Sequence, residues 1–288
     1  MSVFSQGTRS SGLIRLAAAG IALVSLSGFR SFEANFAPDS DLWSRWEAHN
    51  PQRVEVVDVS AWNDILAAYV IQDIDGLNRF AYGDVSPANR ERLKQFIAEQ
   101  TALPVSDYSR PAQKAYWINL YNAVTVDVVL DAYPVESIRE IDISPGLFAD
   151  GPWGKELVSV EGEDLTLNDI EHRILRPIWN DARIHYAVNC ASVGCPNLQA
   201  EAFTADNVER LLETGARSYV NSPRGVSISE GKVTVSSIYD WFFEDFGTSE
   251  EDVLAHLLAY ADDDLASELR SIGKLDDAAY DWSLNDAR

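Results

Sequence analysis

The fold depends first on the stretch RPAQKAYWINLYNAVTVDVVLDAYP, residues 110–134. Apolar side chains occupy nearly every side of this stretch, and a helix that is apolar all round is a buried one. The helix is expected to end at Pro134. Asn119 and Asn122 are three residues apart and therefore project from the same face. A buried amide without a partner costs roughly 1–3 kcal/mol, so both side chains either brace a neighbouring loop or line a site.

The segments around this helix predict a mixed architecture. Capping residues and helical periodicity indicate five more helices, in residues 57–69, 86–102, 166–176, 205–220 and 250–261. Glu161-Gly162 and Glu230-Gly231 each fit the turn of a hairpin. Few strands without regular βαβ alternation predict an α+β fold. We expect a single domain of several helices with small antiparallel hairpins or a small antiparallel sheet.

Two of these segments carry chemistry as well as structure. The helix opened by Thr166 is expected to stop at Arg176, before Pro177. Residues 183–190 alternate between apolar and polar side chains, which predicts a strand. Gly194 and Pro196 then indicate a turn.

Composition limits the classes of function. The chain has 288 residues, of which 46% are hydrophobic and 24% are charged, as is typical of a globular protein. Lys and Arg total 23 against 45 Asp and Glu, so the net charge is −22. Such an excess of acid repels phosphate backbones and anionic membrane surfaces. We therefore expect no nucleic-acid partner, and the sequence specifies no other partner.

The first 29 residues differ from the rest of the chain. They contain Arg9, Arg15 and no acidic residue, followed by an apolar run from Leu16 to about Leu26 and then small residues. This is the pattern of a secretory signal peptide. The apolar run is shorter than the roughly 20 residues that span a bilayer, although an uncleaved anchor is the alternative. We expect an exported protein, periplasmic or extracellular, that has no stable membrane insertion after cleavage. Residues 30–54 are expected to form a polar lead-in to a domain at 55–286.

Residues 183–198, RIHYAVNCASVGCPNL, hold both cysteines of the chain. A cysteine attacks as its thiolate, and a pKa near 8.5 leaves little thiolate at neutral pH unless a base or a helix N-terminus assists. Cys190 lies where the predicted strand gives way to a turn, a position that exposes a side chain. His185 is five residues away and would face the other side of a regular strand. His172 is the second candidate base, and Glu171 and Asn119 are the candidates for orienting an imidazole.

Three other interpretations of this stretch stay open. Export favours oxidised thiols, so Cys190 and Cys195 can form a disulfide if their Cα atoms lie within about 7 Å. A metal site of His185, Cys190 and Cys195 is disfavoured, because structural zinc normally takes four ligands with CxxC-like pairs. We therefore expect no metal and no cofactor. A buried cysteine beside a core histidine is the structural alternative.

Two aromatic segments near the C-terminus are interpreted as structural. Asp240, Glu244 and Asp245 in SIYDWFFEDFG resemble a carboxylate cluster, but the interleaved aromatic residues favour a packed helix start with exposed acids. The segment YDWSL, residues 280–284, is interpreted as core packing rather than a ligand site.

Several motifs in series resemble the domain of unknown function 547 family, which occurs in bacteria and, fused to other segments, in plants. The resemblance covers about residues 55–286. Its motifs are AYWINLYNA (115–123), LTLNDIEHRILR (165–176), RIHYAVNCASVGCPNL (183–198), VSSIYDWFFEDFG (235–247) and YDWSLN (280–285).

The resemblance implies which residues matter. Residues matching Asn119, Asn122, Glu171 and Cys190 are typical of the family. The position of Cys195 is cysteine in bacterial members and serine in plant members, which argues against an obligatory disulfide. The family is similar to papain- or transglutaminase-like proteins, whose histidine follows the cysteine. This chain departs from that order, because His172 and His185 precede Cys190 and only His256 follows, in a helix without a supporting motif.

These observations predict a thiol-dependent hydrolase or acyltransferase that acts on an amide or peptide-like bond. Cys190 is the expected nucleophile, with His185 or His172 as base, Glu171 as orienting group and Asn119 as polarising amide. The alternative is a non-catalytic binding or structural module, in which the same residues form a buried polar network.

Overall fold

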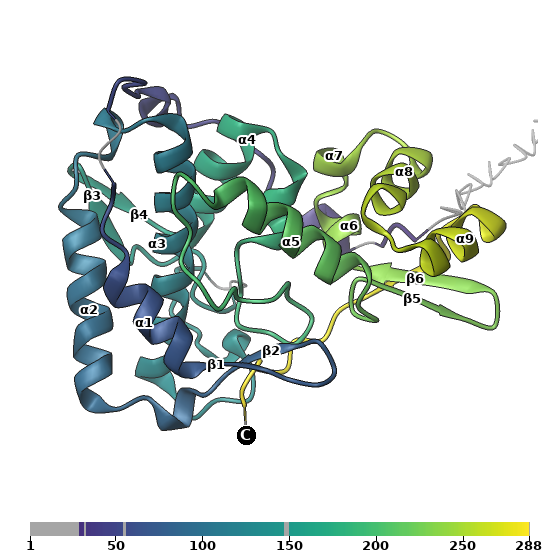
Figure 1. Ribbon diagram of the computed structural model, residues 1–288, viewed down its shortest axis with the longest axis horizontal. Coiled ribbons are helices and arrows are strands. Elements are labelled where there is room, and N and C mark those ends of the chain that lie inside the picture. Colours follow the sequence, from purple (N-terminus) through teal and green to yellow (C-terminus); the bar gives the residue numbers. More distant parts are fainter. Residues whose placement is uncertain (1–28, 32, 54–55, 147–149, 288) are drawn as a thin grey trace, which may run out of the picture.

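The structure is a computed structural model that describes residues 29–31, 33–53, 56–146 and 150–287 (Figure 1). The predicted signal peptide therefore lies outside the described residues, apart from Phe29. No helix in the described part of the chain has the length and apolar character needed to cross a bilayer.

Helices dominate the described chain. The α-helices are α1 (Ser60–Tyr69), α2 (Pro87–Thr101), α3 (Arg110–Ala132), α4 (Arg176–Trp179), α5 (Val208–Val220), α6 (Ile238–Trp241), α7 (Phe243–Phe246), α8 (Glu250–Tyr260) and α9 (Asp263–Ile272). The short 3₁₀ helices are η1 (Glu33–Phe36), η2 (Ser44–Glu47), η3 (Tyr82–Asp84), η4 (Val105–Asp107), η5 (Ile138–Glu140) and η7 (Ala182–Tyr186). One π-helix, η6, covers Asp169–Leu175.

The strands form small sheets. Their bounds are β1 (Val70–Gln72), β2 (Asn78–Phe80), β3 (Val158–Val160), β4 (Glu163–Leu165), β5 (Val226–Ser229), β6 (Lys232–Ser236) and β7 (Asp277–Ala279). The antiparallel pairs are β1–β2, β3–β4 and β5–β6, and β7 adds to β6 in the parallel direction. The expected turns are confirmed: Glu161-Gly162 and Glu230-Gly231 all have positive φ, as a two-residue hairpin turn requires. The α+β, single-domain prediction is confirmed.

The helix α3 is the centre of the fold, as its apolar surface predicts. Its side chains are buried from Ala112 to Val126 on every face, and α2, α5 and η6 contact it (Figure 1). Asn119 Nδ2 donates to Phe203 O at 2.7 Å, and Asn119 Oδ1 accepts from Phe203 N at 3.0 Å. Asn122 Nδ2 donates to Ala187 O at 2.9 Å, and its Oδ1 accepts from Asn189 N at 2.8 Å. Both amides therefore brace loops, and that of Asn122 holds the loop before Cys190.

Replacing Asn122 with Ala is expected to lower the free energy of unfolding by about 3 kcal/mol. The substitution leaves one backbone N–H and one backbone C=O buried without a partner, and each costs roughly 1–3 kcal/mol. Urea unfolding followed by circular dichroism measures the change. The matched control is Gln95→Ala, on the exposed face of α2, which is expected to change it by less than about 0.5 kcal/mol. An equal, small effect of both substitutions would contradict the bracing role of Asn122.

Two local predictions were wrong. Residues 183–190 are not a strand: the 3₁₀ helix η7 begins after Asp181, whose side chain accepts from Arg183 N, and the chain then turns into the Cys190 loop. The helix that Thr166 opens does not stop at Arg176. It continues through Pro177 into α4, because the His172 and Arg173 carbonyls accept from Asp41 N and Trp43 N and so do not need an N–H donor at residue 177.

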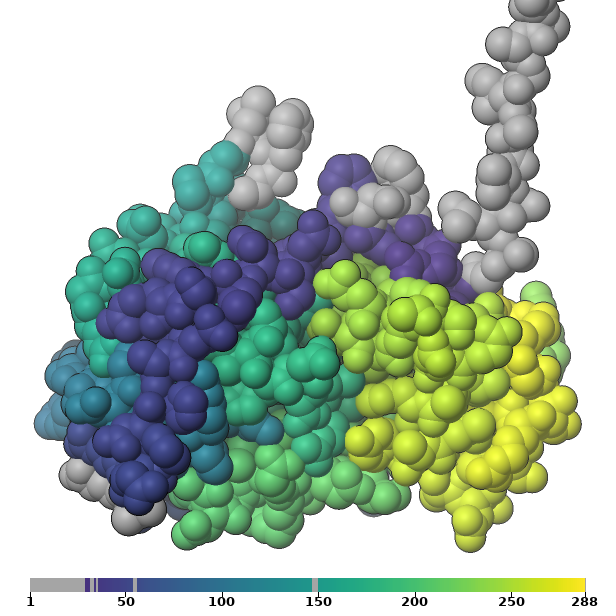
Figure 2. Space-filling view, turned by 90° about the horizontal axis from the view of Figure 1, so that it is seen from above, coloured from purple at the N-terminus to yellow at the C-terminus, as the bar shows by residue number. Residues whose placement is uncertain are grey.

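Both ends of the described chain pack against the region of Cys190. Residues 33–53 lie across one face, in purple and dark blue in Figure 2, between α6–α9 and the helices that precede them. Their backbone bonds to the π-helix: Asp41 N donates to His172 O and Trp43 N donates to Arg173 O, both at 3.0 Å. The expected lead-in is therefore a strap fixed onto the site. The C-terminal segment runs back past the Cys190 loop, where Gly194 N donates to Asp281 O at 2.8 Å.

Candidate active site around Cys190

A pocket of about 660 Å³ lies where the strap, α3, η6, α6, the Cys190 loop and the C-terminal segment meet. Cys190, Cys195, Glu171, His172 and His185 all line it. The structure thus brings together four of the five predicted catalytic residues. The fifth, Asn119, is not among the lining residues, because its amide is taken up by the backbone of Phe203.

The loop that carries Cys190 is tied down on both sides. Asn189 Oδ1 accepts from Ala191 N at 2.9 Å, and Ala191 has a φ of 59°, a left-handed conformation that is uncommon for a residue with a side chain. Gly194 passes so close to the C-terminal segment that a Cβ there would lie 2.8 Å from Asp281 N. Only glycine fits without a shift of that backbone, so this glycine sets the path of the loop between the two cysteines.

The Cys190 thiol has three polar neighbours. Its Sγ lies 3.0 Å from Tyr280 Oη, 3.2 Å from Ser192 Oγ and 2.9 Å from Cys195 Sγ. Burial raises the pKa of Cys190, but the hydrogen bonds from Cys195, Ser192 and Tyr280 outweigh it, and the net shift of that pKa is downward. Burial raises the pKa of both Cys195 and Tyr280. Both groups stay protonated and can donate to a Cys190 thiolate.

The expected pairing of Cys190 with an imidazole is not present. Within the described residues, no histidine nitrogen lies within hydrogen-bond distance of Cys190 Sγ, whose bonds are those to Ser192, Cys195 and Tyr280. His185 Nε2 bonds instead to Asp245 Oδ2 at 2.6 Å, and its ring stacks on Phe242 with centroids 4.5 Å apart. His185 therefore does not act directly on the thiol in this structure.

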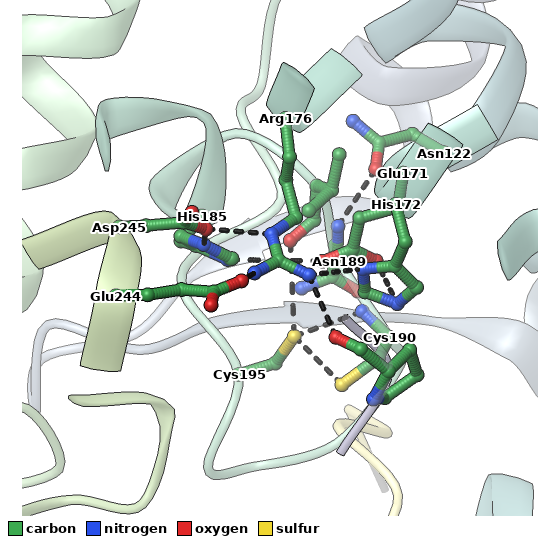
Figure 3. Close-up of polar contacts among 12 residues, drawn as sticks. Asn122, Glu171, His172, Arg176, His185, Asn189, Cys190, Cys195, Glu244 and Asp245 are labelled. Carbon is green, nitrogen blue, oxygen red and sulfur yellow. Dashed lines mark hydrogen bonds and ion pairs between the residues drawn. The ribbon is translucent and has the colours of Figure 1, made fainter. Parts of the chain in front are cut away.

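A chain of polar contacts runs from the pocket-lining residues Glu171 and His185 to Asp245 and Arg176, which lie behind the floor of the pocket (Figure 3). Asp245 Oδ2 accepts from Arg176 Nε at 2.6 Å as well as bonding His185. Burial raises the pKa of Asp245, but the bonds from His185 and Arg176 lower it to about 2, so the group is an anion at neutral pH. His185 Nδ1 then lies 3.7 Å from Glu171 Oε1. These contacts thus connect Asp245, in α7, through His185 to Glu171.

The tautomer of His172 follows from its partner. Arg176 Nη1 lies 3.0 Å from His172 Nδ1, and a guanidinium only donates, so this nitrogen accepts. Burial lowers the pKa of His172 to about 4, so the ring is neutral at pH 7 and its proton is on Nε2. His172 Nε2 lies 4.0 Å from Glu171 Oε2, and both residues line the pocket.

Several site residues were missed by sequence reasoning. Ser192 and Tyr280 contact the thiol, and Arg176 and Asp245 form the buried ion pair behind it. The acids of SIYDWFFEDFG were expected to be exposed, which is wrong for two of them: Asp240 is fully buried, and the side chain of Asp245 is 16% exposed. The signal was the aromatic residues around them, which indicate burial and therefore buried partners. YDWSL was expected to pack in the core, but of its five residues only Leu284 is buried, and Tyr280 and Trp282 are half-buried and line the pocket.

The two sulfur atoms are not bonded. Cys190 and Cys195 are both free thiols with Sγ atoms 2.9 Å apart, and Cys190 N donates to Cys195 Sγ at 2.8 Å. A disulfide therefore stays an alternative state of the same pair. In the described chain, no three His, Cys, Asp or Glu side chains are grouped so as to hold a metal ion.

The protein is expected to lose stability as the pH falls from 6.5 to 5. Burial lowers the pKa of His172 and of His256 to about 4, whereas an unfolded histidine titrates near 6.5. The unfolded chain therefore binds protons in this range that the folded chain does not, at a cost of about 2 kcal/mol for each histidine at pH 5. Asp245, with a pKa of about 2, is ionised in both states and adds no slope.

Urea unfolding between pH 5 and 7.5 measures this dependence, and His256→Gln is expected to remove about half of the slope. In the described chain, His256 has its hydrogen bond with the buried Tyr186 hydroxyl, at 2.7 Å, and it lies outside the pocket lining. The variant therefore removes the contribution of His256 and leaves that of His172. An unchanged slope in His256→Gln would show that the folded protein protonates this ring.

Residues 105–220 match the family model described as protein of unknown function, DUF547. The matched segment begins at η4 and ends with α5, and it includes α3, η6 and the Cys190 loop. The match supports the resemblance to this family over that segment, while the motifs at 235–247 and 280–285 lie beyond it. The family description names no activity. No curated protein and no solved structure matches the chain.

Proposed function

We propose that the protein is a thiol-dependent hydrolase or acyltransferase that acts on an amide or peptide-like bond, with Cys190 as its nucleophile. The observation that carries the proposal is the position of the thiol. Cys190 is half-buried at the wall of a 660 Å³ pocket, and Tyr280 Oη lies 3.0 Å from its sulfur. A lowered thiol pKa beside a cleft is the arrangement that nucleophilic cysteines share.

The chemistry follows from the neighbours of the thiol. The Cys190 thiolate attacks a carbonyl carbon, and the S–C bond forms as the carbonyl oxygen becomes an oxyanion. The proton that Cys190 loses when it ionises passes to solvent water. The C–N bond then breaks, and the amine leaves with a proton that it takes up from solvent water. Water or a second acceptor takes the acyl group and restores the thiol. Tyr280 and Cys195 stabilise the thiolate before attack, because both remain protonated.

Glu171 and His172 are assigned the remaining roles. The charge of Glu171 opposes ionisation of Cys190, which indicates that the two groups are close enough to interact across the pocket. Glu171 keeps its charge and orients the substrate, with His185 Nδ1 3.7 Å from its carboxyl group. The Nε2–H of His172 is the donor placed for the oxyanion. Asn119 takes no part in the reaction, because it braces Phe203.

Acylation of the intact protein tests the proposal. The wild type is incubated with p-nitrophenyl acetate, release of p-nitrophenol is followed, and the acyl group is located by peptide mass spectrometry. We expect a burst of about one equivalent per chain and an acetyl group on Cys190. Acylation of surface lysines alone, without a burst, would overturn the assignment.

The alternative is a non-catalytic module, and one observation favours it. The polar groups at and behind the floor of the pocket have hydrogen-bond partners among themselves. Asp245 bonds both Arg176 and His185, as in a network that only stabilises the fold. In that case Cys190 would acylate no faster than a thiol of an unfolded peptide. The burst experiment therefore separates the two functions.

Export is a further part of the proposal. It is supported by the basic, then apolar, then small-residue pattern of the first 29 residues. The described residues just beyond them are anchored: Ser31 N donates to Asp240 Oδ2 at 3.0 Å, and Arg30 pairs with the same carboxylate. N-terminal peptide mass spectrometry of the protein recovered from its native compartment is expected to show a chain that begins near residue 30. An intact N-terminus in the cytosolic fraction would contradict export.

A further inference from the structure

One wall of the pocket is built from aromatic side chains, which we call the aromatic wall. It consists of Trp153, Trp241, Tyr280 and Trp282, and all four rings are half-buried. The ring centroid of Trp282 lies 4.7 Å from that of Tyr280, 5.6 Å from that of Trp241 and 5.8 Å from that of Trp153. The rings come from three separate segments of the chain, so the fold assembles this surface beside the thiol. Rings that only filled the core would be closed off from the pocket.

A carboxylate without an arginine or lysine partner in the described chain also lines the pocket. The ion-pair neighbours of Glu171 within the described residues are two imidazoles, His185 Nδ1 at 3.7 Å and His172 Nε2 at 4.0 Å. Neither is within normal hydrogen-bond distance. His172 is neutral at pH 7, and His185 bonds to the anionic Asp245. The negative charge of Glu171 is therefore not balanced by any arginine or lysine in the described chain.

The other charges near the pocket do not change this balance. Arg139 and Asp150 line the rim and form an ion pair with each other. Arg176 is paired with Asp245 and Glu244 behind the floor. The guanidinium of Arg139 lies 5.2 Å from the ring centroid of Trp282, so the aromatic wall already has a cation on one ring at its edge. The other rings of the wall line the same 660 Å³ pocket as Glu171 and Cys190, and this volume is large enough for a small organic cation.

We propose that the pocket binds the cationic group of the substrate, an ammonium or guanidinium, between the aromatic wall and Glu171. The term substrate rests on the proposed thiol chemistry, whereas the binding of the cation does not. Aromatic faces attract cations through the quadrupole of the ring, and the attraction is stronger where the site is shielded from water. The net charge of −22 raises the local concentration of cations around the whole molecule. The substrate class is thus an amide that carries a positively charged side chain or amine tail.

Binding of small probes to the folded Cys190→Ser protein tests this inference. In this variant thiol chemistry cannot contribute, so a failure to bind cations is distinct from a failure of Cys190 to acylate. The probes are n-pentylammonium chloride and 1-pentanol, which share a chain and differ in charge, and free N-acetylglucosamine, a neutral sugar that stacks on aromatic rings. Isothermal titration calorimetry at low ionic strength measures each affinity.

We expect n-pentylammonium to bind at least tenfold more tightly than 1-pentanol and N-acetylglucosamine. Glu171→Gln and Trp282→Leu, each introduced into the Cys190→Ser protein, are expected to weaken the ammonium about tenfold. The matched control is Trp43→Leu, which removes a tryptophan with a similar cation contact, from Arg173 at 4.6 Å, that does not line the pocket. It is expected to leave the affinity unchanged.

Three results would overturn the inference. They are equal binding of the amine and the alcohol, preferential binding of the sugar, and an affinity for the amine that is the same in Glu171→Gln, Trp282→Leu and Trp43→Leu. Thermal unfolding of each variant is recorded alongside, and the two pocket variants act on different sides of the site. If one of these two variants does not fold, the affinity of the other for n-pentylammonium still tests the inference.

Discussion

Replacing Cys190 with Ser is expected to reduce acylation by p-nitrophenyl acetate at least a thousandfold. A serine hydroxyl needs a base within hydrogen-bond reach, and in the described chain no imidazole is within that reach of the Cys190 sulfur. The Tyr280 hydroxyl that assists a thiolate is itself a donor and cannot remove a proton from serine. The loss is measured as the burst rate at saturating ester.

Cys195→Ser is the matched control, because it changes the neighbouring sulfur 2.9 Å away and keeps a hydroxyl donor in its place. It is expected to retain the burst within tenfold. Loss of the burst in both variants would point to a reaction that needs both thiols. Loss of the burst only in Cys195→Ser would show that Cys195, and not Cys190, is the nucleophile.

The second large effect is expected from Asp245→Ala, which should lower the free energy of unfolding by about 3 kcal/mol. The side chain of Arg176 is 1% exposed, and removal of its partner leaves a buried charge, a change that typically costs 3–5 kcal/mol. The remaining partner, Glu244, is 59% exposed and can compensate only in part.

The double variant Arg176→Met, Asp245→Ala tests the cause. We expect it to be more stable than Asp245→Ala alone, because it removes the unpaired cation. Urea unfolding at pH 7 compares the free energies of unfolding of Asp245→Ala, Arg176→Met and the double variant. A double variant less stable than Asp245→Ala by the full cost of Arg176→Met would show that the two charges do not interact.

Local signals predicted most of the elements. Ser86 and Pro87 mark the start of α2, and the Ser86 side chain accepts from Asn89 N at 3.2 Å as such a cap should. Glu161-Gly162 specified a hairpin through backbone conformations that few other pairs adopt. The apolar surface of α3 specified its burial. In each case the information lies within a few residues of the element.

Residues 183–190 show where local pattern fails. Their alternation fits a strand, but a strand needs a neighbouring strand as hydrogen-bond partner. In the described chain, side chains bond the backbone of this segment instead. Asp181 caps the 3₁₀ helix, and Asn122 holds the backbone that follows it, at Ala187 and Asn189. Hydrogen bonds to residues distant in the sequence thus decide the conformation of this segment, against the strand that its apolar–polar alternation predicts.

Only part of the site was predicted, because some of its contacts join residues that are distant in the sequence. Cys190, Glu171, His172 and His185 lie in motifs whose polar residues are conspicuous among apolar ones, and all four reach one pocket. Tyr280 is 90 residues from Cys190 and reaches the thiol only because the C-terminal segment folds back along the loop. No spacing in the sequence specifies that contact. Asp245 looked solvent-exposed because its partner Arg176 belongs to another element.

The central claim is that Cys190 is an activated thiol, and the pH dependence of its alkylation tests this most directly. The native protein is treated with iodoacetamide between pH 5 and 10, and modification of each cysteine is followed by peptide mass spectrometry. We predict that the rate at Cys190 rises with a midpoint below 8.5, that Cys195 stays unmodified, and that Tyr280→Phe moves the midpoint upward by about one pH unit. Tyr69→Phe, whose hydroxyl bonds Asn89 outside the pocket lining, should leave it unchanged. Equal, slow labelling of both cysteines with a midpoint at or above 8.5 would contradict the account.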